Sequence, residues 1–483
     1  MSMISSVRRN TVYSFLSSSI RLVSNLLMFV GIARFYDVKT FGQFTTAHTF
    51  LMVFFLFADF GFDMLVTTGI ARERDRSAVY IRRYLPMKII FSLSSFLCMA
   101  LIALVSDFSR ETKLFMIILS SGIVANAVSS FCYAVFKGYE DLSQEFRVSL
   151  VQNSVLLCCL VLLGFLGVPA MYVALAFVGS RVIGALMIAP KLFSIQKLRS
   201  VDFRSSGWLS IIRDGIPFGV HLIFGTLFFQ MDTILLSYFR GDESVGIYQA
   251  AMRLVYGIFI IPDVLSNAFI PMLSRLHSEN HSEWTRVGKV LQKTLMFSSL
   301  PLGIIFYLYA DQLIPLIYGS RAFTEAIPLM RIFAFIIVLR FSVETYAMIL
   351  TVSRVQEWRM RIVIFLTVFN LTLNIFAIPR YGVTGAAFVS LATNFVAGIL
   401  YVAAAHIRAF RFSYAIEARP ILAIATVILS AGFLGALGVH SMFIGIPAIL
   451  LVSLIVYYLV GYSREERKLI FSMPSGVSIS GSR

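Results

Sequence analysis

The fold is decided by residues 10–70, NTVYSFLSSSIRLVSNLLMFVGIARFYDVKTFGQFTTAHTFLMVFFLFADFGFDMLVTTGI. Two apolar runs flank a short polar break, and at 1.5 Å rise per residue each is long enough to span a hydrocarbon core of ~30 Å. Arg21 lies in the first run and Asp59 near the end of the second, at similar predicted depth. Ionisable groups at that depth usually face a bundle interior or a wet cavity. We therefore predict a helical hairpin in which Arg21 and Asp59 form an ion pair.

The composition places the whole chain in a membrane. Of 483 residues 58% are hydrophobic and 14% are charged, and the mean hydropathy is +0.84. Soluble domains average roughly a quarter charged residues, so we predict an all-α polytopic membrane protein. The four cysteines fall inside apolar runs without metal-ligand spacing, and P-loop, GxSxG and HExxH motifs are absent from the sequence. The sequence thus predicts no metal, no cofactor and no enzymatic activity.

Basic residues predict the orientation of the helices. Apolar runs of spanning length number about fourteen, and alternate connections hold 27 basic residues on one side and 7 on the other. The minority are Arg34, Lys39, Arg110, Lys113, Arg240, Arg321 and Arg380. Because basic residues are retained in the cytoplasm, both termini are predicted to be cytoplasmic. The same bias explains the net charge of +16 without any nucleic acid as partner.

The chain resembles itself at an offset of 204 residues. Residues 33–63 align with 237–267, so that Gly42 corresponds to Gly246 and Asp59 to Asp263. This parallel repeat predicts two six-helix lobes related by an axis along the membrane normal. The predicted domains are an N-terminal lobe at 1–196, an interfacial linker at 197–213, a C-terminal lobe at 214–409, two extra helices within 410–471 and a disordered tail at 472–483.

Arginines within the predicted spans are the candidates for substrate binding. Each costs roughly 2.5–3.5 kcal/mol at a helix centre unless it faces water, a partner or an anionic ligand. The candidate cationic cavity consists of Arg21, Arg181, Arg253 and Arg340. The alternatives are pairing with acids of other helices, an interfacial position for Arg253, and an ion pair of Arg340 with Glu344 that locks one helix.

Candidates for conformational or ion coupling are Asp59, Asp263, Glu344 and His221. Against these roles stand a helix-end acid that reaches cytoplasmic water, which we prefer for Asp63, and a packing role for a lone histidine. Two further expectations concern helices near residues 230 and 370. Asp232 is expected to contact solvent, and Asn374 to bond between helices.

Two short motifs carry a family resemblance. Ala33-Arg34-Phe35-x5-Phe41-Gly42-x-Phe44, followed by Ala58-Asp59-Phe60-Gly61-Phe62, resembles the start of Wzx-type polysaccharide flippases, a branch of the MATE-like multidrug/oligosaccharidyl-lipid/polysaccharide (MOP) superfamily. The resemblance implies a V-shaped pair of six-helix lobes around a cationic cavity. It implies transport of an undecaprenyl-diphosphate-linked oligosaccharide, such as an O-antigen repeat unit, across the bacterial inner membrane. The expected partners are this lipid-linked oligosaccharide, H+ or Na+ for coupling, and the polymerase and chain-length regulator of the same pathway.

Two other functions remain open from the sequence. A multidrug or organic-cation exporter of the same superfamily favours a cavity rich in carboxylates, whereas buried arginines outnumber buried acids here. A membrane glycan polymerase commonly carries a large outer loop, and the longest outer connection, 309–326, is short. The anionic lipid-linked substrate is therefore the leading hypothesis.

Overall fold

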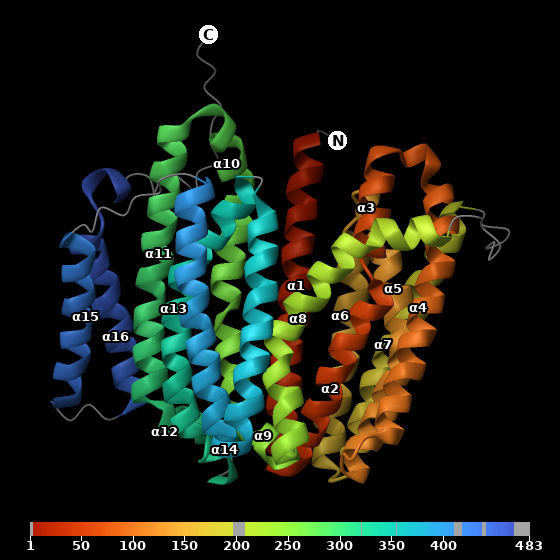
Figure 1. Ribbon diagram of the computed structural model, residues 1–483, viewed down its shortest axis with the longest axis horizontal. Coiled ribbons are helices and arrows are strands. Elements are labelled where there is room, and N and C mark those ends of the chain that lie inside the picture. The colour runs from red at the N-terminus through yellow and green to blue at the C-terminus, as the bar shows by residue number, and fades with distance from the viewer. Residues whose placement is uncertain are drawn as a thin grey trace. The chain divides into compact units, whose positions relative to one another are not determined.

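The computed structural model describes residues 3–196, 208–319, 321–353, 355–409, 418–436 and 441–467. Within these residues all regular structure is helical (Figure 1), which confirms the predicted fold class. Contacts divide the chain into two compact units. Unit 1 comprises Met1–Arg253, Tyr318–Phe323 and Asn370–Ala386, and unit 2 comprises Leu254–Ile317, Thr324–Phe369 and Ala387–Arg483.

Unit 1 is built on helices α1 to α9. They are α1 (Met3–Phe35), α2 (Val38–Asp59), α3 (Phe62–Arg72), α4 (Ser77–Val105), α5 (Arg110–Gly138), α6 (Ser143–Phe165), α7 (Met171–Gln196), α8 (Trp208–Arg240) and α9 (Asp242–Ile258), whose last residues belong to unit 2, with a short 3-10 turn η1 (Arg74–Arg76). Helix α2 packs on α4, α5 and α8, and α5 also packs on α7. Helix α2, the second half of the predicted hairpin, is therefore at the centre of unit 1, and α1 packs on α6.

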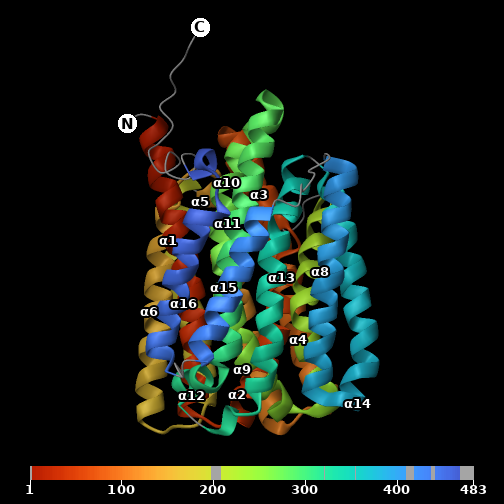
Figure 2. The same cartoon turned by 90° about the vertical axis from the view of Figure 1, so that its left-hand side faces the viewer.

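Unit 2 contains the remaining helices. They are α10 (Ile260–Glu279), α11 (His281–Leu308), α12 (Ala310–Tyr318), α13 (Ala326–Val352), the outer parts of α14 (Gln356–Ala404), η3 (Ala405–Ala409), α15 (Ala418–Ala436), α16 (Met442–Val456) and the π-helix η4 (Tyr457–Gly461). Helices α15 and α16 pack on each other and on α11 (Figure 2). The short turn η2 (Arg321–Phe323) belongs to unit 1.

Helix α14 is a hairpin of two helices. Gly382 interrupts it with φ 58° and ψ −137°, a conformation that is open to glycine. A Cβ atom built on Gly385 would lie 2.7 Å from the carbonyl oxygen of Ala377. Eight residues of straight helix span about 12 Å, so this close approach requires the chain to reverse at Gly382.

Twelve helices within the described residues are long and apolar enough to cross a membrane. This count takes α14 as one helix and leaves out α15, whose apolar stretch is Arg419–Phe433. The exact number of fourteen is not confirmed by length and composition and stays a prediction.

The predicted domain boundaries also stay a prediction. Residues 197–207 of the linker and the tail beyond residue 467 lie outside the described residues, and 208–213 form the start of α8. The segments of the second half of the sequence that belong to unit 1 contain Arg240, Arg321 and Arg380. These arginines are among the seven basic residues on the side that holds few of them, which we call the minority-basic face. The ends of second-half helices at that face thus pack with the first half.

The offset of 204 residues appears in the structure as a reciprocal contact between α2 and α9. A Cβ on Gly42 would lie 1.8 Å from the carbonyl oxygen of Asp242, and one on Gly246 would lie 2.3 Å from that of Val38. Val38 and Asp242 correspond in the repeat, as do Gly42 and Gly246. A two-fold axis typically produces this pattern, in which one residue contacts the repeat equivalent of a second residue while the second contacts the repeat equivalent of the first. The crossing supports the parallel repeat predicted from sequence.

Candidate functional site

Three of the four predicted cavity arginines gather in unit 1. Arg21 lies on α1, Arg181 at the middle of α7 and Arg253 on α9, all within apolar spans. Arg21 and Arg181 are close enough to interact electrostatically, and Arg181 and Arg253 both act on the imidazole of His48. We call Arg21, Arg181 and Arg253 the cation cluster, and His48 lies beside it.

Arg21 pairs with a glutamate from α6. Its Nη1 donates to Glu145 Oε1 at 2.6 Å, and Nη2 donates to Ser18 Oγ at 3.2 Å. Glu145, whose side chain is 4% exposed, also pairs with Lys137 at 3.1 Å. One buried carboxylate thus serves two cations, so the surroundings of Arg21 stay net positive.

The predicted ion pair of Arg21 with Asp59 is wrong. Asp59 pairs instead with Lys88 of α4, whose Nζ lies 2.5 Å from Asp59 Oδ1 and 2.8 Å from Asp63 Oδ1. Counting residues along the two helices places Arg21 and Asp59 at comparable depths, but depth does not define how each helix is rotated about its axis. The same triad contradicts the expectation that Asp63 is simply solvated from the cytoplasm.

Arg181 is held by an aromatic ring and an amide. Its guanidinium carbon lies 4.5 Å from the centre of the Phe177 ring, one turn earlier on α7. With its amide turned so that the oxygen faces α7, Gln152 accepts hydrogen bonds from Arg181 Nε at 3.2 Å and from Nη1. Neither partner carries a negative charge. Within the described residues the Arg181 guanidinium is therefore held by a ring and a neutral amide.

Arg253 and His48 meet around a second ring. The guanidinium carbon of Arg253 lies 3.6 Å from the centre of Phe29, and the His48 ring lies 5.0 Å from Phe29 and 5.8 Å from Phe177. His48 is 2% exposed, and neither ring nitrogen has a hydrogen-bond partner among the described residues. Stacking on aromatic faces stabilises guanidinium groups at some distance from any carboxylate.

The fourth predicted arginine lies in unit 2. Arg340 stacks 5.0 Å above the ring centre of Phe259, and Asp263 is within electrostatic range of Glu344, Arg340 and Arg359. These charges form a mixed group within unit 2. His221 lies on α8, and its side chain is outside the described part of the structure.

Asp232 is buried, which contradicts its predicted solvent contact. It is 7% exposed, accepts from the Tyr248 hydroxyl at 2.6 Å and accepts from Asn374 Nδ2 at 2.7 Å. These bonds join α8, α9 and α14, which confirms the interhelical role expected for Asn374. Two neutral donors thus hydrogen-bond this buried carboxylate, as buried polar groups require.

Sequence reasoning missed Lys88, Glu145, Gln152 and His48. Lys88 is 1% exposed and occupies an otherwise apolar run after Pro86, so a lone lysine in a spanning segment was the available signal. Glu145 lies in the first turn of α6, where an acid has an ordinary electrostatic explanation. His48 and Gln152 have no such signal, because neutral polar residues are common in membrane helices.

Comparisons with known proteins agree with this architecture. The family described as polysaccharide biosynthesis protein matches residues 7–277, and the MatE family matches residues 217–376. A putative O-antigen transporter of Shigella dysenteriae is 21% identical over 289 residues, which is 58% of this chain and 71% of that protein. A probable flippase, AglR of Haloferax volcanii, is 28% identical over 180 residues, covering 36% and 37% of the two chains. An uncharacterized membrane protein of Methanocaldococcus jannaschii is 25% identical over 288 residues, 56% of this chain and 66% of that one.

Solved structures show the same fold at low identity. The lipid II flippase MurJ in an inward closed conformation has a TM-score of 0.74 at 14% identity, covering 95% of this chain and 99% of its own. An inward-facing MATE multidrug transporter of the MOP superfamily has a TM-score of 0.65 at 16% identity, covering 82% and 97%. Since the first family match covers more than half of the sequence, the chain belongs to the polysaccharide biosynthesis protein family, with the fold of MurJ and MATE transporters.

Proposed function

We propose that this protein is a flippase that moves a polyprenyl-diphosphate-linked oligosaccharide across the bacterial inner membrane by alternating access, with both termini cytoplasmic. The two lobes at 1–196 and 214–409 alternate around the substrate. Asp59, Asp263 and Glu344 are assigned to coupling with H+ or Na+. The basic asymmetry of 27 to 7 supports the orientation.

The cation cluster carries the proposal. Arg181 and Arg253 lie within apolar spans and rest on Phe177 and Phe29. A diphosphate group carries negative charge, and arginine binds phosphate through two parallel hydrogen bonds. Charge-assisted bonds of this kind contribute roughly 1.5–3 kcal/mol each.

Unit 2, taken by itself, contains a groove whose lining has the chemistry that a polyprenyl chain needs. A cavity of about 880 Å³ lies between α11, α13, α14 and α15, and its lining is almost wholly apolar. Phe335, Phe388 and Phe395 line it and are more than half exposed. An isoprenoid chain needs apolar contact along its length and no hydrogen-bond partner, which matches this lining.

Contacts within unit 1 support a conformation closed at the minority-basic face. Asp242 at the start of α9 accepts from Ser109 Oγ at 2.7 Å and from Thr112 Oγ1 at 2.9 Å. The Tyr318 hydroxyl donates to the carbonyl of Ala250 at 2.7 Å, and Phe41 of α2 packs on the Phe323 ring at 5.7 Å. In our proposal these contacts must break before the substrate can leave at that face.

The test is transport of a fluorescent polyprenyl-diphosphate oligosaccharide by purified protein in liposomes. Arg181→Ala should lower the flipping rate at least 10-fold, because it removes a charge-assisted contact, and Arg181→Lys should recover part of the rate. Arg331→Ala is the matched control, since that exposed arginine pairs with Asp311 at 3.2 Å near the membrane edge.

Two results would contradict the proposal. An unchanged rate in Arg181→Ala would remove the anionic-substrate argument. Export of a lipophilic cation such as ethidium by the wild type, without flipping of the glycolipid, would establish the multidrug alternative that the MATE fold shares.

A further inference from the structure

A second cleft in unit 2 lies between α11 and the end of α16. Its volume is about 510 Å³, and Phe297, Pro301, Leu302, Leu450, Leu454 and Tyr457 are among the residues that line it. Leu454 is 70% exposed, and its neighbours Leu450 and Tyr458 are nearly half exposed. The cleft therefore opens onto the apolar outer surface of α16, where lipid chains are the solvent.

One end of this cleft is cationic. Arg467 lines it, and its guanidinium donates to the carbonyl oxygens of Tyr462 at 3.2 Å and Leu459 at 3.3 Å. Those carbonyls lie at the π-helix η4, a kind of irregularity that is frequent at functional sites. The guanidinium carbon also lies 5.1 Å from the centre of the Tyr458 ring.

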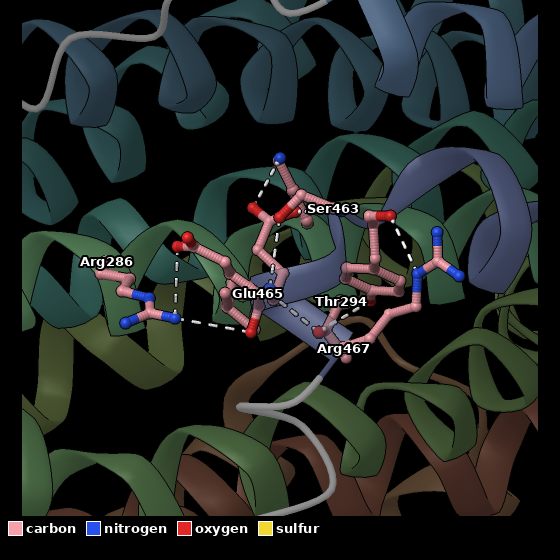
Figure 3. Close-up of polar contacts among 9 residues, drawn as sticks. Arg286, Thr294, Ser463, Glu465 and Arg467 are labelled. Carbon is pink, nitrogen blue, oxygen red and sulfur yellow. Dashed lines mark hydrogen bonds and ion pairs between the residues drawn. The ribbon is translucent and has the colours of Figure 1, made fainter.

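The neighbouring carboxylates are already paired with other cations (Figure 3). Glu466 bonds to Lys293 Nζ at 2.7 Å, and Glu465 lies 3.7 Å from Arg286. Among the described residues, Arg467 has no carboxylate partner. A positive charge thus remains at the end of an apolar cleft.

Tyr457 provides a second unmatched group in the lining of the same cleft. Its ring stacks on Phe297 with centres 4.2 Å apart, and the residue is 6% exposed. Its hydroxyl has no hydrogen-bond partner in the part of the chain that the structure describes. The nearby Tyr462 hydroxyl, by contrast, bonds to Thr294 at 2.9 Å. Leaving a buried hydroxyl unpaired costs roughly 1–3 kcal/mol, so a ligand that accepts from it is favoured.

We propose that this cleft binds one anionic phospholipid of the leaflet on the basic side. Arg467 holds the lipid phosphate, the Tyr457 hydroxyl donates to an ester carbonyl, and one acyl chain lies along Leu302 and Leu454. Basic pockets between membrane helices on the cytoplasmic side bind anionic headgroups in this way. The lipid joins the end of α16 to α11, so it stabilises the attachment of the last two helices.

A phospholipid fits this cleft better than the polyprenyl chain of the substrate. The 510 Å³ cleft combines an apolar wall with a cation at one end and a hydroxyl in its lining, as an amphiphile with ester groups requires. The 880 Å³ groove has the almost wholly apolar lining that suits an isoprenoid. The proposal requires only insertion in a membrane and is independent of the transported substrate.

The experiment is native mass spectrometry of the full chain after titration with phosphatidylglycerol or phosphatidylcholine in detergent, together with thermal unfolding. The wild type should retain phosphatidylglycerol selectively and gain thermal stability from it. Arg467→Gln and the cleft-filling Leu454→Trp should each retain one phosphatidylglycerol fewer and lose the gain. Arg464→Gln, an exposed arginine of the same segment, is the matched control and should behave as the wild type.

Three results would overturn the proposal. They are equal retention in the wild type and both variants, equal binding of phosphatidylcholine, and displacement of phosphatidylglycerol by a polyprenyl phosphate at equal concentration, which would assign the cleft to the substrate. If the purified wild type binds phosphatidylglycerol but does not flip the glycolipid, only the proposed function is contradicted. Lipid retention and thermal stability are measured here without any transport.

Discussion

The α2–α9 crossing should not tolerate a single added methyl group. In Gly42→Ala the new Cβ would lie 1.8 Å from the carbonyl oxygen of Asp242 and 2.9 Å from the backbone nitrogen of Gly246. Both obstacles are backbone, so no side-chain rotation relieves them. A carbon and an oxygen approach to roughly 3.3 Å without repulsion, and the two helices would have to separate by about 1.5 Å.

That separation acts on the contacts that close the minority-basic face. Asp242 would move away from Ser109 and Thr112, whose hydroxyls donate to it at 2.7 and 2.9 Å. Hydrogen bonds to a charged group contribute roughly 1.5–3 kcal/mol each, so losing both destabilises the closed state by about 3 kcal/mol or more. At 1.4 kcal/mol per factor of ten, the open fraction rises on the order of 100-fold.

The assay is labelling of a cysteine at Phe323 by a membrane-impermeant maleimide. Phe323 is 1% exposed in the closed contact, so labelling from outside should be slow in the otherwise wild-type chain and much faster with Gly42→Ala. Gly225→Ala is the matched control, because a Cβ there meets no atom within 4 Å. Equal labelling rates with Gly42→Ala and Gly225→Ala would refute the reasoning.

Two further predictions concern buried ion pairs. Lys88→Met leaves Asp59 and Asp63 without their cation and should lower the unfolding free energy, measured in detergent, by roughly 3–5 kcal/mol. Adding Asp59→Asn to this variant should restore part of the loss. No restoration would mean that Lys88 and Asp59 are not coupled. Burial alone raises the pKa of Glu466, but hydrogen bonds from Lys293 and Ser463 outweigh it and hold this pKa below its ordinary value of 4.5. The contribution of Glu466 to stability is therefore present above pH 4.5 and lost as the pH falls below it. Between pH 5 and pH 3 the melting temperature should decline more steeply in the wild type than in Glu466→Gln. Parallel declines would exclude this linkage.

The helices could be predicted from the sequence because spanning length and apolar composition are local properties. Helix α14 reverses at Gly382, which lies between two of the apolar runs predicted from the sequence, so each run corresponds to one of its two helices. The gathering of Arg21, Arg181 and Arg253 in unit 1 also follows from a simple cost, since charges in apolar spans must share a polar interior. The partners of those charges depend on helix rotation and packing, which periodicity in uniformly apolar helices does not reveal.

The internal repeat shows the same limit more sharply. Lys88 on α4 and Lys293 on α11 stand 205 residues apart, close to the repeat offset, and both are nearly fully buried. Lys88 bonds to Asp59 of its own half, whereas Lys293 bonds to Glu466, beyond the last long helix. Asp263, the counterpart of Asp59, is left exposed. A repeat therefore predicts where a buried charge occurs, but segments added after the repeat can replace its partner, because a buried ammonium requires a carboxylate and not one particular carboxylate.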